Sequence, residues 1–154
     1  MAFVDFYAVE GSVEQKKFYN VSMGVGPNAH NRRDDVLLVQ YMLKRVYEKP
    51  SYPKIQLTKQ QGPMIVDGIC GPITARWIRH FQDDLRNAGA KVLADGRIDK
   101  ALAGMASISG TEYTIHLLND AFRGHYADIY EKMPVHPDVP AELRAALIAH
   151  AAAA

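Results

Sequence analysis

One spacing of residues occurs twice in this chain and limits the folds that it can adopt. The two copies are Val36, Val39, Gln40 and Leu43 before Asp67-Gly68, and Ile78, Phe81, Gln82 and Leu85 before Asp95-Gly96. In an Asp-Gly turn the aspartate accepts backbone N–H bonds, while the glycine adopts a positive φ. The sequence therefore predicts the succession of helix, loop, Asp-Gly turn and helix two times.

Apolar residues at helical spacing predict two long helices in the first half of the chain. The first begins at Asp34-Asp35, whose negative charge suits the positive end of the helix dipole, and extends through residues 36–47. The second begins at Pro72, because proline at the first helical position gives up no hydrogen bond, and it ends before Gly89. Its inward face is predicted to be Ile73, Trp77, Ile78, Phe81 and Leu85.

The segments that flank these two helices predict further structure. Residues 3–9 and 18–25 are rich in aromatic and β-branched side chains and could pair as a β-hairpin. A short third helix is expected to start at Asp99 and to cover residues 101–105. Further helical segments are expected over residues 112–122, 126–133 and 141–150.

The residues around the two turns have local physical explanations that need no ligand. The isoleucine after each Asp-Gly pair, Ile69 or Ile98, is expected to enter the core as an anchor. Thr74 is expected to bond a free carbonyl or to pack by its methyl group near the start of its helix. Gln40 and Gln82 are expected to be half-buried amides that satisfy loop backbone, although Gln82 is also a candidate for ligand contact.

The run at residues 66–74, Val-Asp-Gly-Ile-Cys-Gly-Pro-Ile-Thr, resembles the signature of the peptidoglycan-binding domain 1 family when taken with Trp77-Ile78 and Phe81-Gln82. Residues 36–43 resemble the first helix of that family, and residues 93–99 resemble its closing turn. The resemblance implies a compact three-helix fold and a non-catalytic role in holding bacterial cell wall. The residues that form this fold signature are Asp67, Gly68, Gly71, Pro72, Thr74, Trp77, Phe81, Asp95 and Gly96.

With this resemblance, the predicted fold is mainly α. It has a three-helix core like the peptidoglycan-binding domain at residues 33–105, an N-terminal extension at 1–32 that could hold the β-hairpin, and a C-terminal helical extension at 106–154. The two extensions have no counterpart in the family and could cover the groove that a wall glycan would occupy.

Two departures from the family pattern also stand out. Gln40 and Asp67 are 27 residues apart, against 13 for Gln82 and Asp95, so the first copy carries an insertion at residues 51–64. Asp99-Lys100 stands where the family usually has Gly-Pro, and Leu102 stands where threonine is expected. The third helix is therefore predicted to be capped differently.

The resemblance directs attention to groups that could hold peptidoglycan, a polymer of N-acetylated sugars and short peptides with carboxylates. Such a binder needs an aromatic or apolar platform and a few fixed polar groups. Trp77 lies on the inward face of its helix, and we interpret it as core rather than platform. The candidates for ligand contact, around the first and second helices, are Tyr47, Tyr52, Arg76, Arg79 and Gln82.

The sequence shows no arrangement typical of an enzyme. The six histidines include no pair with the spacing of a helical zinc site and a nearby acid, and His116 falls on the predicted polar face of its helix, where a solvated imidazole is expected. Cys70 lies inside a turn without a histidine partner in view. The glutamates include no obvious pair for glycoside cleavage, so we expect no catalysis, no metal and no cofactor.

The charge balance restricts the class of partner. With 18 basic and 17 acidic residues the net charge is +1, and Asp83-Asp84 with Arg79 and Arg86 is expected to form a mixed, solvated helix face. This balance argues against duplex nucleic acid and anionic membrane surfaces, and no apolar run reaches the ~20 residues of a membrane span. No basic region precedes the first apolar residues, so a secretory signal is not expected. The protein is expected in the bacterial envelope or exported by a route independent of a signal peptide, with the cytoplasm as the alternative.

The leading hypothesis is non-catalytic binding of peptidoglycan, through either its glycan or its stem peptide. A second hypothesis is an adaptor or accessory protein of a secretion or phage system that uses the same fold to bind another protein. It is motivated by the unmatched half of the chain. A minor third hypothesis is a cell-wall hydrolase with its active site in the C-terminal tail.

Overall fold

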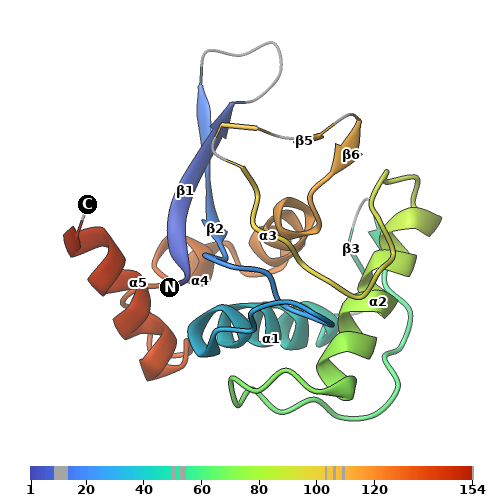
Figure 1. Cartoon of the computed structure of the whole chain (residues 1–154), viewed down its shortest axis with the longest axis horizontal. Coiled ribbons are helices and arrows are strands. Elements are labelled where there is room, and N and C mark those ends of the chain that lie inside the picture. The colour runs from blue at the N-terminus through green and yellow to red at the C-terminus, as the bar shows by residue number, and fades with distance from the viewer. Residues whose placement is uncertain are drawn as a thin grey trace.

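A computed structural model describes residues 1–8, 14–49, 51–52, 55–102, 104–105, 107–108 and 110–153. Within these residues the chain forms five helices and three two-stranded antiparallel sheets, a mixed fold that is mostly helical (Figure 1). The helices are α1 (Arg33–Tyr47), α2 (Pro72–Asn87), α3 (Thr114–His125), α4 (Ala127–Glu131) and α5 (Ala141–Ala153). The strands are β1 (Phe3–Ala8), β2 (Gln15–Asn20), β3 (Ser51–Tyr52), β4 (Ile55–Gln56), β5 (Ser107–Ile108) and β6 (Thr111–Glu112).

Helix α1 is the centre of the core and contacts α2, α3 and α5. Figure 1 shows it running beneath α3, with α2 toward one end and α5 toward the other. Its N-terminal turn is fixed by a buried carboxylate, Asp35, which accepts hydrogen bonds from the backbone N–H groups of Ser22 and Met23. The predicted first helix is therefore confirmed. Its acidic first turn suits the helix dipole, and Asp35 also binds the loop at Ser22 and Met23.

Helix α2 confirms the predicted second helix and most of its inward face. The exception is Ile73, whose expected place in the core is wrong because 44% of its surface is exposed. Thr74 occupies the inward position instead, and its hydroxyl accepts a hydrogen bond from Gln40. Since successive residues are about 100° apart around a helix, Ile73 falls outside the buried face.

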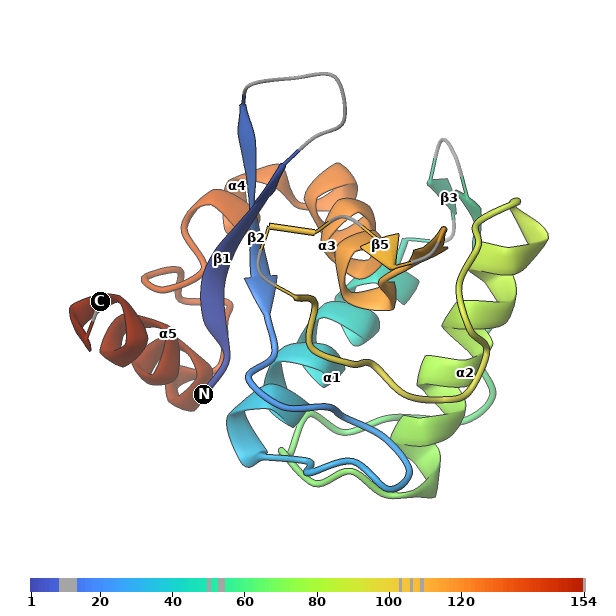
Figure 2. The same cartoon turned by 45° about the horizontal axis from the view of Figure 1, so that its top comes forward.

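The predicted N-terminal hairpin is present: β1 pairs with β2 from Phe3 opposite Asn20 to Ala8 opposite Gln15. The bounds expected for its second strand, 18–25, are wrong, because the pairing register places that strand at Gln15–Asn20. Its connection, including Gly11 and Ser12, lies outside the described residues. In Figures 1 and 2 the hairpin stands above α1, beside α3 and α4. Asn119 of α3 binds the hairpin backbone at Tyr19, donating to its carbonyl at 2.9 Å and accepting from its N–H at 2.8 Å.

The short helix expected over residues 101–105 is wrong for the residues that the structure describes there. The Asn20 side chain binds both backbone groups of Ala101, and Gly104 forms a bridge to Tyr7 of β1. These tertiary bonds hold the segment extended along the hairpin. The later helical predictions are confirmed as α3, α4 and α5.

Candidate functional site

The first Asp-Gly turn is held by one buried amide from α1. The Gln40 side-chain nitrogen donates to the Asp67 carboxylate, the Ile69 carbonyl and the Thr74 hydroxyl, at 3.0–3.2 Å. The amide oxygen of Gln40 accepts from the N–H groups of Asp67 and Gly68. One glutamine therefore joins α1, the turn and the first turn of α2.

The second Asp-Gly turn repeats this network one helix later. The Gln82 side-chain nitrogen donates to the Asp95 carboxylate, the Arg97 carbonyl and the Thr114 hydroxyl, at 2.8–3.3 Å. Its oxygen accepts from the N–H of Gly96 at 2.8 Å. Because both glutamines are fully buried and use the same atoms, each set of glutamine, turn and threonine is called an amide–turn unit below.

The two units also correct one expectation from the sequence. The equivalents of Ile69 and Cys70 are Arg97 and Ile98, since the turns align at Asp-Gly. Ile98 is buried as expected, but Ile69 is 66% exposed, so its predicted place in the core is wrong. The inward position of the first turn belongs to the half-buried Cys70, because it comes two residues after the glycine.

The threonine of the second unit is Thr114 of α3, not a residue near position 102. Thr74 follows Asp67 after seven residues, whereas Thr114 follows Asp95 after nineteen. This longer connection contains the bridge from Gly104 to the hairpin and the β5–β6 sheet. The third helix tied by these units is therefore α3.

A pocket of about 370 Å³ lies where the end of α1 meets α2 and the inserted loop, and we call it the Tyr47 pocket. Tyr47 and Trp77 form its aromatic part, with ring centres 5.8 Å apart in an edge-to-face arrangement. The residues that line it are Lys44, Tyr47, Glu48, Lys59, Gln60, Gly62, Pro63, Met64 and Trp77. An aromatic surface with polar groups at its rim is the form expected of a site for a small organic ligand.

The Tyr47 ring is fixed by a buried carboxylate that the sequence did not reveal. The Tyr47 hydroxyl donates to Asp84 at 2.7 Å, and the hydroxyl and backbone N–H of Thr58 donate to the same carboxylate. Burial, with the adjacent Asp84, raises the pKa of the Tyr47 hydroxyl well above its usual value. The expectation that Asp84 lies on a solvated face is wrong, because the inserted loop covers it.

The remaining candidates for ligand contact do not converge on one place. Arg76 and Arg79 are exposed on α2 and line neither this pocket nor the one described next, and Arg79 pairs with Asp83 at 3.4 Å. Gln82 belongs to the second amide–turn unit. The Tyr52 side chain lies outside the described residues.

A second pocket, of about 350 Å³, lies beside the second amide–turn unit, and we call it the Asp95 pocket. Its apolar lining comes from Leu93, Ile108 and Tyr113. Its charged groups are engaged within the fold. The contacts are Asp95 with the N–H of Arg97, Arg97 with Asp99, and Glu112 with the N–H of Lys91.

The two pockets therefore differ in what they offer a ligand. Across the part of the chain that the structure describes, Lys44 and Lys59 have neither an ion pair nor a hydrogen bond from their ammonium groups. Glu48, the carboxylate in the same pocket, is paired with Arg45. The Tyr47 pocket thus combines an aromatic surface with two unpaired cations, whereas the charges of the Asp95 pocket stabilise its own walls.

His116 contradicts its prediction as a solvated imidazole, since only 5% of its surface is exposed. The rings of Tyr7 and Phe18 from the hairpin lie 4.1 and 4.3 Å from its ring centre, and its Nε2 lies 3.2 Å from the Met105 carbonyl oxygen. Burial lowers the pKa of this imidazole. No local pattern in α3 reveals this, because the covering residues come from the other end of the chain.

The described residues contain neither a candidate metal site nor a membrane-spanning helix. No group of three or more histidine, cysteine, aspartate or glutamate side chains there could hold a metal ion. None of the helices in these residues has the length and apolar character to cross a bilayer.

Comparison with known proteins gives no assignment for this site. The chain matches no family model, and no curated protein or solved structure is significantly similar to it. The family resemblance therefore depends on the motifs of the sequence.

Proposed function

We propose that this protein binds bacterial cell-wall peptidoglycan without cleaving it, and that the polymer docks at the Tyr47 pocket. The observation that carries the proposal is the pocket itself, which has an aromatic surface and two unpaired lysines in its lining. Peptidoglycan carries both the sugar faces that pack on aromatic rings and the carboxylates that pair with lysine. A neutral polymer could pack on the aromatic rings but would form no ion pair with the two lysines.

The duplicated motif supports the same proposal at the level of the fold. The residues that resemble the peptidoglycan-binding domain 1 family include the two Asp-Gly turns and Thr74, which take part in the amide–turn units. We propose that α1, α2 and α3, tied by these units, correspond to the three helices of that family. On this proposal, the residues that resemble the family are the ones that hold the three helices together.

Co-sedimentation with purified sacculi tests the proposed function. Wild-type protein is expected in the pellet at low salt and increasingly in the supernatant as salt rises, because the lysines are exposed and their attraction is screened. A single small pocket gives weak binding, so protein in the micromolar range is appropriate. Absence from the pellet at low salt would contradict wall binding.

An adaptor function is the second candidate, and exposed isoleucines favour it. Ile65, Ile69 and Ile73 are 71%, 66% and 44% exposed, and these apolar side chains would be covered if a protein partner bound there. Sacculi stripped of protein distinguish the two functions. A wall binder sediments with stripped and unstripped sacculi alike, whereas an adaptor sediments only when the envelope proteins remain.

A further inference from the structure

We infer that the Tyr47 pocket selects an N-acetylated amino sugar that carries a carboxylate, in preference to the neutral N-acetylated sugar. The inference rests on the proposed function and names the part of the wall polymer that the pocket recognises. It follows from three features of the pocket: a fixed aromatic ring, a buried donor without an acceptor, and two unpaired cations.

The aromatic ring provides a firm surface for a sugar. The Tyr47 ring is half-buried, its hydroxyl is bonded to Asp84, and its edges meet Trp77 and His80 with ring centres 5.8 Å away. Because this ring is already immobile, a ligand that packs on it loses no side-chain entropy of the protein. The C–H face of a pyranose is a suitable partner for such a surface.

Trp77 provides a donor that the fold leaves unused. Its side chain is 7% exposed and lines the pocket, and its Nε1–H has no acceptor among the described residues. A buried N–H without an acceptor is unfavourable. Because the nitrogen has almost no accessible surface, a ligand carbonyl must displace the side chains over it before it gains a bond absent from the free protein. The acetamido carbonyl of an N-acetylated sugar is an acceptor with a small methyl group beside it. Met64 and Pro63 give the pocket apolar surface for that methyl.

The two lysines provide the selectivity for charge. Lys44 comes from α1 and Lys59 from the inserted loop, so a group between them is approached from two elements. Glu48 does not neutralise them, since it pairs with Arg45. A carboxylate on the sugar therefore meets two ammonium groups without displacing an internal partner.

The lysines of the pocket near the hairpin do not offer this arrangement. Lys16 and Lys17 line the pocket near the hairpin, but they pair with Asp120 and Glu131 respectively. A ligand carboxylate there would compete with the protein's own. The Tyr47 pocket differs because its cations are unengaged and because Tyr47 and Trp77 line the same cavity.

Fluorescence titration of the full chain tests the inference directly, because Trp77 is the one tryptophan in the sequence. N-acetylmuramic acid and N-acetylglucosamine are matched probes, since they differ only by the lactyl group with its carboxylate. We expect the acid sugar to change the Trp77 emission and to bind about fivefold more tightly than the neutral one, the size expected for two exposed ion pairs. Equal binding of the two sugars would overturn the inference.

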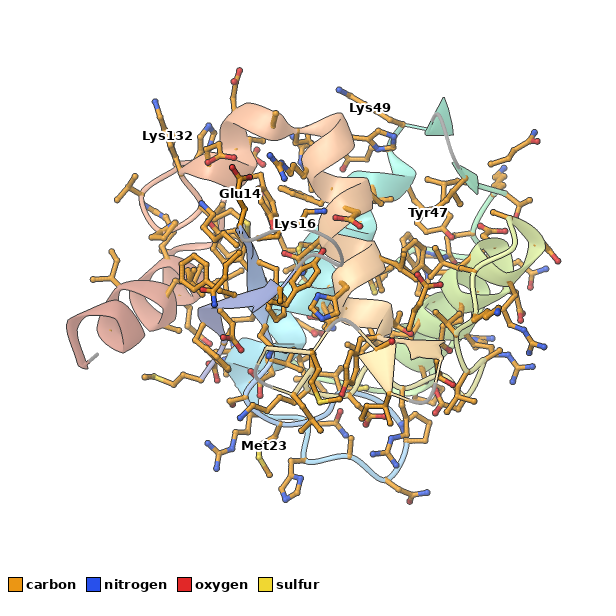
Figure 3. All side chains as sticks on the ribbon, turned by 90° about the horizontal axis from the view of Figure 1, so that it is seen from above. Glu14, Lys16, Met23, Tyr47, Lys49 and Lys132 are labelled. Carbon is orange, nitrogen blue, oxygen red and sulfur yellow. The ribbon has the colours of Figure 1, made fainter. Side chains whose placement is uncertain are left out.

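Variants separate the pocket from a general effect of charge. The double variant Lys44→Gln, Lys59→Gln is expected to fold normally, because both side chains are exposed, and to bind the two sugars equally. Lys132→Gln is the matched control: Lys132 is also exposed and lies on the opposite side of the view from Tyr47 (Figure 3). A similar loss of preference in the control would contradict a role for the pocket.

Wall binding is measured in parallel, so that the two proposals can fail separately. Sacculi whose peptides have been removed expose the lactyl carboxylate, whereas intact sacculi present carboxylates on the attached peptide. Weaker sedimentation of the double variant with the peptide-free sacculi supports the inference. A loss confined to intact sacculi would place the recognised carboxylate on the peptide and would contradict the inference. If wild type sediments but neither sugar affects Trp77 and the double variant sediments unchanged, the inference fails while wall binding stands. If wild type does not sediment, the proposed function itself fails.

Discussion

The two amide–turn units share their bonds but differ in the length of chain between the turn and the threonine. Gln40 and Gln82 each donate to an aspartate, a carbonyl and a threonine hydroxyl, yet the first threonine comes seven residues after the aspartate and the second nineteen. A buried amide needs a fixed set of partners but not a fixed length of chain between them. The polar network therefore defines the turn, while the connection to the next helix is free to carry an insertion.

The surroundings of the two units differ as well. Tyr7 and Phe18 of the hairpin, with Met105 and Tyr113, surround His116 on the second unit's helix, α3, and bury it. Two residues after Thr74, at the equivalent place in α2, Arg76 is exposed. The same position therefore belongs to the surface in one unit and to the core in the other.

Replacement of the two glutamines is the strongest way to break the equivalence of the units. Gln40→Met and Gln82→Met keep the length of the side chain but leave buried turn groups without partners. We expect each to lower the free energy of unfolding by about 3 kcal/mol, measured by chemical denaturation. A loss below about 1 kcal/mol in one variant and a large loss in the other would show that only one amide is structurally important.

The isoleucines after the turns give the next largest contrast. Ile98→Ala is expected to cost about 3 kcal/mol of stability because Ile98 is fully buried. Ile69→Ala is expected to change stability by less than about 0.5 kcal/mol, since Ile69 is exposed. Denaturation midpoints of the pair decide this. Equal losses would mean that Ile69 is an anchor after all.

The glycines of the two turns are expected to differ by a smaller amount. Gly68 and Gly96 have φ of 77° and 75°, so alanine at either place costs about 1 kcal/mol for the left-handed conformation. A Cβ at Gly68 would also lie 2.7 Å from Arg33 Cγ, whereas at Gly96 the nearest atom is the Ala75 carbonyl oxygen at 3.4 Å. Gly68→Ala must move Arg33 and disturb its bond to the Asp67 carbonyl, so its loss is expected to reach about 2 kcal/mol.

Thermal unfolding of both glycine variants measures the difference. Arg33→Ala is the control, because in that background the contact with Arg33 is gone and the two glycine variants should become equal. A persistent difference would place the additional strain of Gly68→Ala elsewhere.

Short-range patterns carried most of the predictable structure. The spacing of Gln40 and Gln82 before their turns indicated amides that satisfy loop backbone, and both do so. The helical spacing likewise gave α1 and α2, because burial of one face repeats every 3.6 residues. These features depend on neighbours close in the chain or on a repeat that can be seen in the sequence.

The remaining features depend on contacts between distant segments, which no local pattern records. Asn20 holds Ala101 extended where a helix was expected, and the two are 81 residues apart. Asp84 is covered by Thr58 of the inserted loop. The sequence therefore did not show that a buried carboxylate holds the Tyr47 ring. Of the candidates for ligand contact, Tyr47 lines that pocket, while the free lysines that complete it were missed because exposed lysines are common everywhere.

The smallest expected effect is a change with pH in the free energy of unfolding. It tests whether His116 is buried, in contrast to the exposed Arg76 at the equivalent position of α2. Burial lowers the pKa of His116 in the folded protein, while the unfolded chain takes up a proton near pH 6.5. Since the unfolded state binds more protons below that pH, stability is fully present above about pH 6.5 and falls as the solution becomes more acidic. The hydrogen bond with the Met105 carbonyl and the carboxylates of Asp120 and Asp5 oppose this lowering of the pKa. Desolvation, with a smaller contribution from the Lys16 cation, outweighs them.

His116→Phe isolates this contribution, because phenylalanine keeps a ring between Tyr7 and Phe18 but does not titrate. We expect the free energy of unfolding of the wild type to fall more steeply than that of the variant between pH 7 and 5. Asp35, whose pKa is raised by burial, titrates in the opposite sense but equally in both proteins, so it cancels in the difference. Arg76→Ala, at the equivalent exposed position, is expected to leave the slope unchanged. If the unfolding free energies of wild type and His116→Phe changed equally with pH, the imidazole would be exposed to solvent, as Arg76 is on α2. The hairpin would then not exclude water from His116.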